Sequence, residues 1–111
     1  MKVSRFDPNL AHPAHEGTIL AMPVLPEGIE APFSHAWGYL EPGGAMDGHA
    51  HPTEEIYFFH RGEGTVVVGS EEHPVRAGDV VEIPPDAYHT VRNPSAGDLL
   101  WFALWWDPIK K

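Results

Sequence analysis

The sequence predicts an all-β domain, and three observations carry that prediction. Proline and glycine, at 12 and 11 of the 111 residues, interrupt the chain at short intervals, so almost no stretch keeps a helical period. Between these breaks lie short runs rich in β-branched and aromatic residues. Their regular spacing is typical of a sandwich or barrel. The expected strands are 17–22, 33–40, 55–60, 64–69, 79–83, 88–93 and 98–106.

The segments between these strands read as turns of a single domain. Glycine occurs at 41–44, beside a proline, and at 61–64, and a proline pair begins the turn at 84–86. We expect residues 1–16 to form an N-terminal arm, residues 17–107 to form the barrel and residues 108–111 to form a C-terminal tail.

Composition excludes several classes of function. The formal net charge of −9 opposes binding to nucleic acid and to anionic membranes. The absence of cysteine excludes disulfide scaffolds, thiolate zinc sites and iron–sulfur clusters. The longest apolar run, at 99–106, is shorter than the roughly 20 residues of a membrane span. Residues 1–10 lack the apolar stretch of a signal peptide, so a cytoplasmic location is expected.

Three histidines and a glutamate are the candidate metal ligands. His49 and His51 flank one residue, so their side chains point the same way on an extended segment. Glu55 opens an expected strand, and His89 lies on another. Imidazole and carboxylate together suit first-row divalent metals. An isolated histidine pair is nevertheless more often a surface feature, and the surrounding glycines and prolines make the pattern specific.

These framing residues resemble the two motifs of the cupin superfamily. The first motif is matched by Gly43, His49, His51, Glu55 and Gly62. The second is matched by Gly78, Pro84, His89 and Asn93. One position departs from the pattern, because Asp86 stands where the family usually places a glycine. Aspartate tolerates turn conformations, so we expect the fold to accommodate it.

The resemblance implies a small, single-domain, bacterial-type cupin with a jelly-roll β-barrel. It also implies that His49, His51, Glu55 and His89 bind one divalent metal: manganese, iron, nickel, cobalt, copper or zinc. Glu54 competes with Glu55 for the carboxylate position. Strand parity favours Glu55, because Glu54 lies on the opposite face.

Two further residues are candidates for catalysis. Tyr57 shares a strand face with Glu55, where it is either a proton donor to substrate or an aromatic wall. His35 alternates with small residues on its strand, so it is a second acid–base group only if the large face points inward. The small face inward is favoured. Three other histidines have no expected partner and are assigned to the surface: His12, His15 and His73.

The expected function is that of a metal-dependent enzyme acting on a small oxygenated molecule. Cupins of this size include dioxygenases and Lewis-acid isomerases, lyases and decarboxylases, and the motif does not choose among them. The alternative is a non-catalytic metal-containing barrel that binds a sugar or small acid. Trp101, Trp105 and Trp106 are too many for one narrow barrel, which predicts that some of them bury a homodimer interface or an N-terminal arm.

Overall fold

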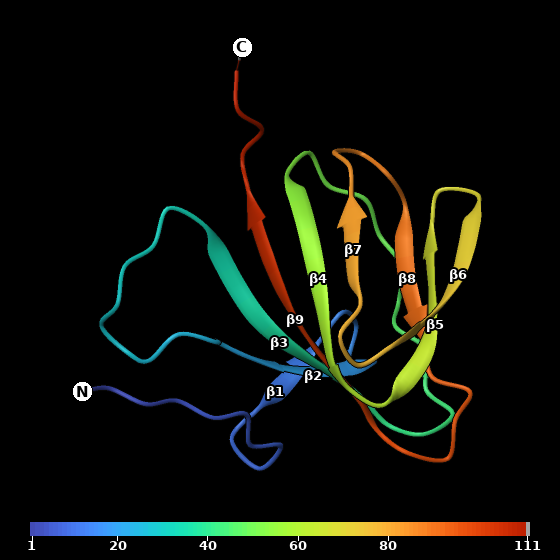
Figure 1. The fold of residues 1–111 in the computed structure, drawn as a ribbon, viewed down its shortest axis with the longest axis horizontal. Helices are drawn as coiled ribbons and strands as arrows, with labels where there is room; N and C mark the ends of the chain where they lie inside the picture. The colour runs from blue at the N-terminus through green and yellow to red at the C-terminus, as the bar shows by residue number, and fades with distance from the viewer. Residues whose placement is uncertain (111) are drawn as a thin grey trace.

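The computed structural model describes residues 1–110, which form nine β-strands (Figure 1). The strands are β1 (His12–Ala14), β2 (Ile19–Met22), β3 (Ser34–Leu40), β4 (Glu54–Arg61), β5 (Glu63–Val68), β6 (Glu71–Arg76), β7 (Val80–Ile83), β8 (His89–Arg92) and β9 (Leu99–Trp106). Within these residues, no helix has the length and apolar character needed to cross a membrane. The nine strands confirm the predicted all-β class.

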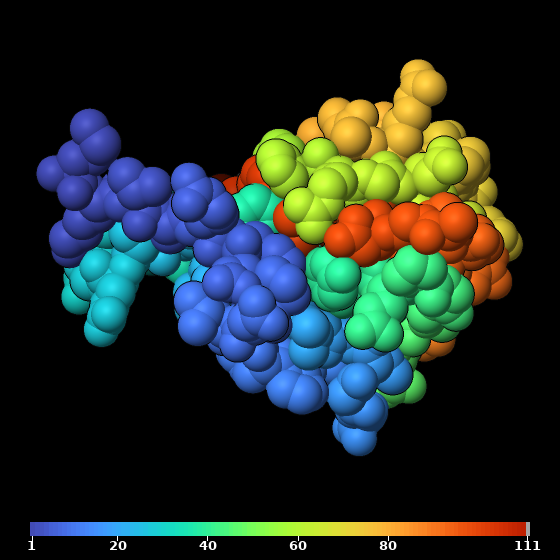
Figure 2. All heavy atoms as spheres, turned by 90° about the horizontal axis from the view of Figure 1, so that it is seen from below, coloured from blue at the N-terminus to red at the C-terminus, as the bar shows by residue number. Residues whose placement is uncertain are grey.

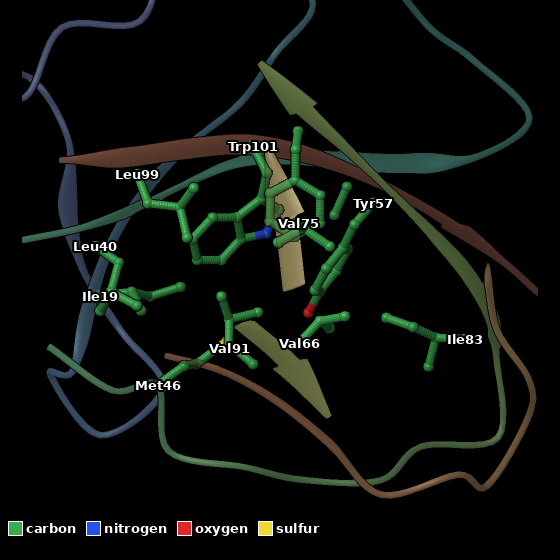
Figure 3. Close-up of a cluster of buried hydrophobic side chains, with 12 residues drawn as sticks. Ile19, Leu40, Met46, Tyr57, Val66, Val75, Ile83, Val91, Leu99 and Trp101 are labelled. Carbon is green, nitrogen blue, oxygen red and sulfur yellow. The ribbon is translucent and has the colours of Figure 1, made fainter. Parts of the chain in front are cut away.

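The strands form two antiparallel sheets that enclose one core. The larger sheet has the order β1-β2-β3-β9-β4-β7, and the smaller has the order β6-β5-β8. Side chains of both sheets meet in one buried cluster, in which Tyr57 and Trp101 from the larger sheet point toward Val66 and Val91 from the smaller (Figure 3). The barrel interior near this cluster is therefore built from residues of both sheets.

Strand β4 shows the expected alternation most clearly. Glu55, Tyr57 and Phe59 are buried, whereas the residues between them are only partly buried. Glu54 thus lies on the outer side, and Glu55 points inward, as parity predicts. In β8, His89 and Val91 are completely buried in the same way.

The small face of β3 points inward, as favoured from the sequence. Gly38 pairs with Trp101 of β9, and a Cβ atom on Gly38 would lie 2.4 Å from the Trp101 ring. Only glycine leaves room for this tryptophan in the core. His35, Trp37 and Tyr39 consequently face the outer side of the sheet.

Two strands depart from the expected pattern. Residues 12–14 were expected to belong to an arm, but they pair with β2 as the edge strand β1. Residues 71–76 form β6, which the sequence analysis did not assign to a strand. Both contain a proline, Pro13 and Pro74, and both lie at a sheet edge, where a missing backbone donor costs no ladder hydrogen bond. Residues 108–110 form no strand, and Lys111 lies outside the described residues.

The beginning of the chain packs against the outer face of the larger sheet. Phe6 stacks on Tyr39 with ring centroids 5.4 Å apart, and it lies 6.1 Å from Trp37. Residues 1–6 then run beside the loop between β2 and β3 (Figure 2). Ser4 donates a hydrogen bond of 2.6 Å to the Val24 carbonyl of that loop. An arm of the chain's own thus covers part of the outer aromatic face.

Candidate metal centre

His49 and His89 are brought together by backbone pairing. The loop before β4 forms an isolated antiparallel bridge to β8 at these two residues. Each backbone amide donates to the carbonyl of the other residue, at 3.2 and 2.9 Å. Directly opposed residues in an antiparallel pair project their side chains to the same face, here into the barrel.

His51 is held by the turn that carries Asp86. The Asp86 amide donates to the His51 carbonyl at 2.7 Å. Asp86 has a φ of 66°, the left-handed conformation for which the cupin motif usually uses glycine. The unusual residue therefore keeps the backbone shape of the motif. Its side chain is exposed.

The three histidines converge closely enough to hold one metal ion. One ligand atom from each of His49, His51 and His89 lies within 4.8 Å of the other two. Glu55 joins them, because its Oε1 lies 3.0 Å from His51 Nε2 and 3.3 Å from His89 Nε2. The Glu55 side chain is only 8% exposed, so its charge needs a nearby cation.

The donor set fits a metal ion because the His89 nitrogen that faces Glu55 has no other partner. His89 Nδ1 donates to the Ala87 carbonyl at 2.9 Å, which leaves Nε2 of the neutral ring as a lone-pair donor. That Nε2 and the Nδ1 of His49 are fully buried without a hydrogen bond. His89 Nε2 instead faces a carboxylate oxygen, and two acceptors at such a distance require a proton or a metal cation between them.

A similar contact orients His51. Its Nδ1 lies 2.8 Å from the Thr53 hydroxyl and 3.3 Å from the Thr53 carbonyl, which can only accept. Its Nε2 lies 3.0 Å from Glu55 Oε1, where a proton or a metal cation can bridge the two atoms. Hydrogen bonding of the remote nitrogen is the usual way in which a protein fixes the tautomer of a metal-binding histidine.

The surroundings of His49 keep its imidazole ring neutral, so that the ring can bind a cation. Burial lowers the pKa of His49 to about 4, and the neighbouring imidazole rings add to this effect. The ring is thus neutral at pH 7, the form that binds a metal. Burial also raises the pKa of the Tyr57 hydroxyl well above its ordinary value, and the Glu55 carboxylate raises it further.

A cavity of about 370 Å³ opens beside these residues. Its polar lining includes His51, Thr53 and Glu55, whereas much of its wall is apolar. The apolar lining residues include Ile19, Ala21, Ala36, Trp37, Met46, Trp101, Ala103 and Trp105. A pocket with a few convergent polar groups among apolar walls is typical of a small-molecule site.

The two catalytic candidates have different placements. Tyr57 lines the cavity but is 97% buried in the core, against Trp101 and near His89. His35 lies on the outer side of β3, where its Nδ1 accepts hydrogen bonds from the Val24 and Leu25 amides at 3.0 and 3.3 Å. The condition for a catalytic His35, the large face inward, is therefore not met, and the catalytic assignment of His35 is wrong.

One cavity residue was missed from the sequence. His15, expected at the surface, lines the cavity, and its ring centroid lies 4.3 Å from that of His49. Burial lowers the pKa of His15, although the Glu55 carboxylate acts in the opposite direction. The only signal in the sequence is the glycine at position 17, which permits a tight hairpin turn there. His12 and His73 are exposed, as expected.

Residues 36–106 match the sequence model of the cupin domain. This match covers more than half of the chain, which therefore belongs to the cupin family. It is a small cupin of the conserved-barrel type. Over 46 residues the chain is 39% identical to an uncharacterized protein of Methanocaldococcus jannaschii. That match spans 40% of this chain and 37% of the archaeal protein.

Solved cupin structures resemble the whole barrel. A Cupin 2 conserved barrel domain protein from Salinispora arenicola is 30% identical with a TM-score of 0.85, over 96% of this chain and 89% of its own. The plu4264 protein of Photorhabdus luminescens is 29% identical with a TM-score of 0.82, over 95% and 87%. A predicted oxalate decarboxylase from Thermotoga maritima is 26% identical with a TM-score of 0.73, over 81% of each chain.

Proposed function

We propose that the chain is a metal-dependent enzyme in which His49, His51, Glu55 and His89 bind one divalent transition metal. The observation that carries this proposal is that one ligand atom each from His49, His51 and His89 cluster together, and that the buried, unpartnered Nε2 of His89 faces the desolvated Glu55 carboxylate. Glu55 supplies a desolvated negative charge that a bound cation would compensate. Three nitrogens and one oxygen suit manganese, iron, cobalt, nickel, copper or zinc.

The substrate is a small molecule that carries oxygen atoms able to bind the metal. The cavity has room for a compact organic molecule rather than a polymer. Its apolar walls would contact the carbon skeleton, and the ligand cluster would hold the oxygens. A bound divalent metal supplies Lewis-acid polarisation of such an oxygen, or dioxygen activation when the metal is redox-active.

Tyr57 is the hydrogen-bond donor of this site in the proposed reaction. Because its pKa is raised well above the ordinary value, the hydroxyl stays protonated at neutral pH and can donate a hydrogen bond, but it cannot serve as a base. A dioxygenase and a Lewis-acid isomerase, lyase or decarboxylase are all compatible with this set. Similarity to the predicted oxalate decarboxylase of Thermotoga maritima supports testing small carboxylic acids first.

A non-catalytic barrel is the second candidate, and the burial of Tyr57 is the observation that favours it. A hydroxyl held in the hydrophobic core serves packing as well as chemistry. Such a barrel would hold a sugar or small acid on its metal without turnover. The two candidates give the same metal content and differ only in whether a bound molecule is converted.

Metal analysis and substrate screening test the proposal together. Protein purified without chelator should contain about one equivalent of metal per chain, and His51→Ala should lose it. His73→Ala is the matched control, because His73 is an exposed histidine of β6. Oxygen uptake and product formation are then followed with small acids, diketones and sugars. Absence of metal from the wild-type protein after reloading would overturn the proposed function, whereas metal without turnover would favour the binding barrel.

The chain is also proposed to form a homodimer. Support comes from the outer face of the larger sheet, where Phe58 and Phe102 stack at 4.7 Å with only partial burial. Aromatic side chains in such a position are typical of subunit interfaces. Light scattering on a sizing column measures the mass directly, and a monomer at micromolar concentration would contradict this part.

A further inference from the structure

His15 stands at the metal centre although it belongs to a distant part of the chain. It lies in the turn between β1 and β2, yet its ring packs against His49 and lines the same cavity as His51 and Glu55. It is not one of the three histidines whose ligand atoms cluster within 4.8 Å. The ring is therefore beside the metal ligands and within reach of the cavity contents, without being part of the ligand set.

The turn that carries His15 is held in an unfavourable conformation. His15 and Glu16 have φ values of 51° and 59°, and Gly17 follows with 78°. Two consecutive non-glycine residues in the left-handed region cost free energy, and such backbone strain persists only where the surroundings hold it. Strain of this kind is concentrated at ligand-binding sites.

Thr18 supplies the contacts that hold the turn over the cavity. Its hydroxyl donates to the His15 carbonyl at 2.6 Å, and its amide also donates to that carbonyl at 3.2 Å. The same hydroxyl accepts from the Asp47 amide at 2.8 Å. Asp47 lies in the loop that carries His49. One side chain thus ties the hairpin turn to the ligand loop.

We propose that His15 is a substrate-binding residue that hydrogen-bonds a polar atom of the molecule held at the metal, and that Thr18 is its positioning residue. This inference rests on the proposed function and adds a requirement for the substrate. The molecule must carry one oxygen-bearing group for the ligand cluster and a second hydrogen-bonding atom directed at the β1–β2 turn. Small hydroxy acids, keto acids and hydroxamates have this form.

The test compares metal binding with binding of a chemical probe. Each protein is loaded with Co²⁺, whose absorption spectrum reports ligand binding, and is then titrated with acetohydroxamate, a small bidentate oxygen ligand. Chloride serves as a second, monatomic probe. The variants are His15→Ala, Thr18→Val and Thr18→Ser, and His12→Ala is the matched control because His12 is an exposed histidine three residues away.

The expected result separates the two binding steps. Co²⁺ stoichiometry stays near one in every variant, whereas His15→Ala weakens acetohydroxamate binding about tenfold, as loss of one hydrogen bond does. Thr18→Val weakens it by a smaller factor, Thr18→Ser restores it, and His12→Ala has no effect. Chloride, which has no second polar atom, should bind equally well to the wild type and His15→Ala.

Three results would overturn the inference while leaving the proposed function intact. They are unchanged acetohydroxamate affinity in His15→Ala, loss of Co²⁺ from that variant, which would make His15 a metal ligand, and a Co²⁺-loaded wild type that binds neither probe. Failure of the wild type to bind Co²⁺ would instead overturn the proposed function, and the inference with it.

Discussion

The proposed ligand cluster and the β1–β2 hairpin meet at the cavity, but only the ligand cluster has a recognisable pattern in the sequence. The loop before β4, the start of β4 and β8 carry the proposed metal ligands, and their histidines, glycines and proline form a recognisable motif. The β1–β2 hairpin contributes His15 through a strained turn and a single threonine contact. A ligand motif can therefore define the chemistry of a site, while the residue at its mouth depends on tertiary packing.

The two segments also differ in burial, and hence in tolerance to change. His89 is completely buried, and the hydrogen bonds of its bridge to His49 tie the ligand loop to the barrel. The β1–β2 turn is mostly exposed at Glu16, Gly17 and Thr18. We therefore expect substitutions of the proposed ligands to abolish metal binding. Substitutions in the hairpin turn should only change the affinity for a small molecule or the stability.

The largest effect is expected at the ligand cluster. His89→Ala removes a buried nitrogen aimed at the metal position, so metal affinity should fall at least a hundredfold, the upper end of the effect of residues that only support ligands. Isothermal titration with Co²⁺ measures the change. His73→Ala should bind as the wild type does, and equal loss in both variants would show a non-specific effect of removing histidine.

The next largest effect, on the free energy of unfolding, is expected at Asn93, which directly follows β8. Asn93 is 1% exposed, and its amide nitrogen donates to the Leu40, Glu41 and Gly97 carbonyls. Asn93→Ala removes these hydrogen bonds from a buried side chain and should lower the free energy of unfolding by about 2 kcal/mol. Urea unfolding of the two proteins measures the difference. Equal midpoints would mean that water replaces the amide without cost.

The free energy of unfolding of the metal-free protein is expected to depend on pH through His49. The pKa of His49 is about 4 in the folded protein and near its ordinary value of 6.5 when unfolded. Between these values the unfolded state binds more protons, so the free energy of unfolding decreases as the pH falls from 6.5 to 4. His49→Gln should show a shallower decrease in urea unfolding across this range. Parallel profiles would contradict a depressed pKa.

The smallest effect is expected in the hairpin turn. Glu16→Gly removes a side chain from a left-handed backbone position and should stabilise the protein by a few tenths to about 1 kcal/mol. Glu30→Gly is the matched control, because Glu30 is exposed and has no positive φ, so it should be neutral or destabilising. Thermal unfolding compares them, and equal shifts in both variants would argue against strain at position 16.

Most of the fold could be predicted because local signals agreed with the final architecture. The alternation in β4 and the paired motifs placed Glu55, His89 and the inward faces correctly. Strands β1 and β6 were not predicted because Pro13 and Pro74 argue locally against a strand. Both strands lie at sheet edges, where a proline is tolerated.

The site could be predicted only in part, for a similar reason. Parity divided β3 into two faces, but the choice between them depended on Trp101, which needs the space above Gly38. That contact turns His35 outward. His15 lies at the cavity because its turn has positive φ values and because the Asp47 amide donates a hydrogen bond to the Thr18 hydroxyl. Neither feature produces a periodic pattern in the sequence.

Anomalous diffraction from crystals of the metal-loaded protein tests the central claim most directly. Data collected on both sides of the cobalt absorption edge locate the ion independently of any assumed ligand. The account predicts one peak per chain, bound by nitrogens of His49, His51 and His89 and by a Glu55 oxygen, with space left on the cavity side. A peak elsewhere, or one without Glu55 and His89, would contradict it.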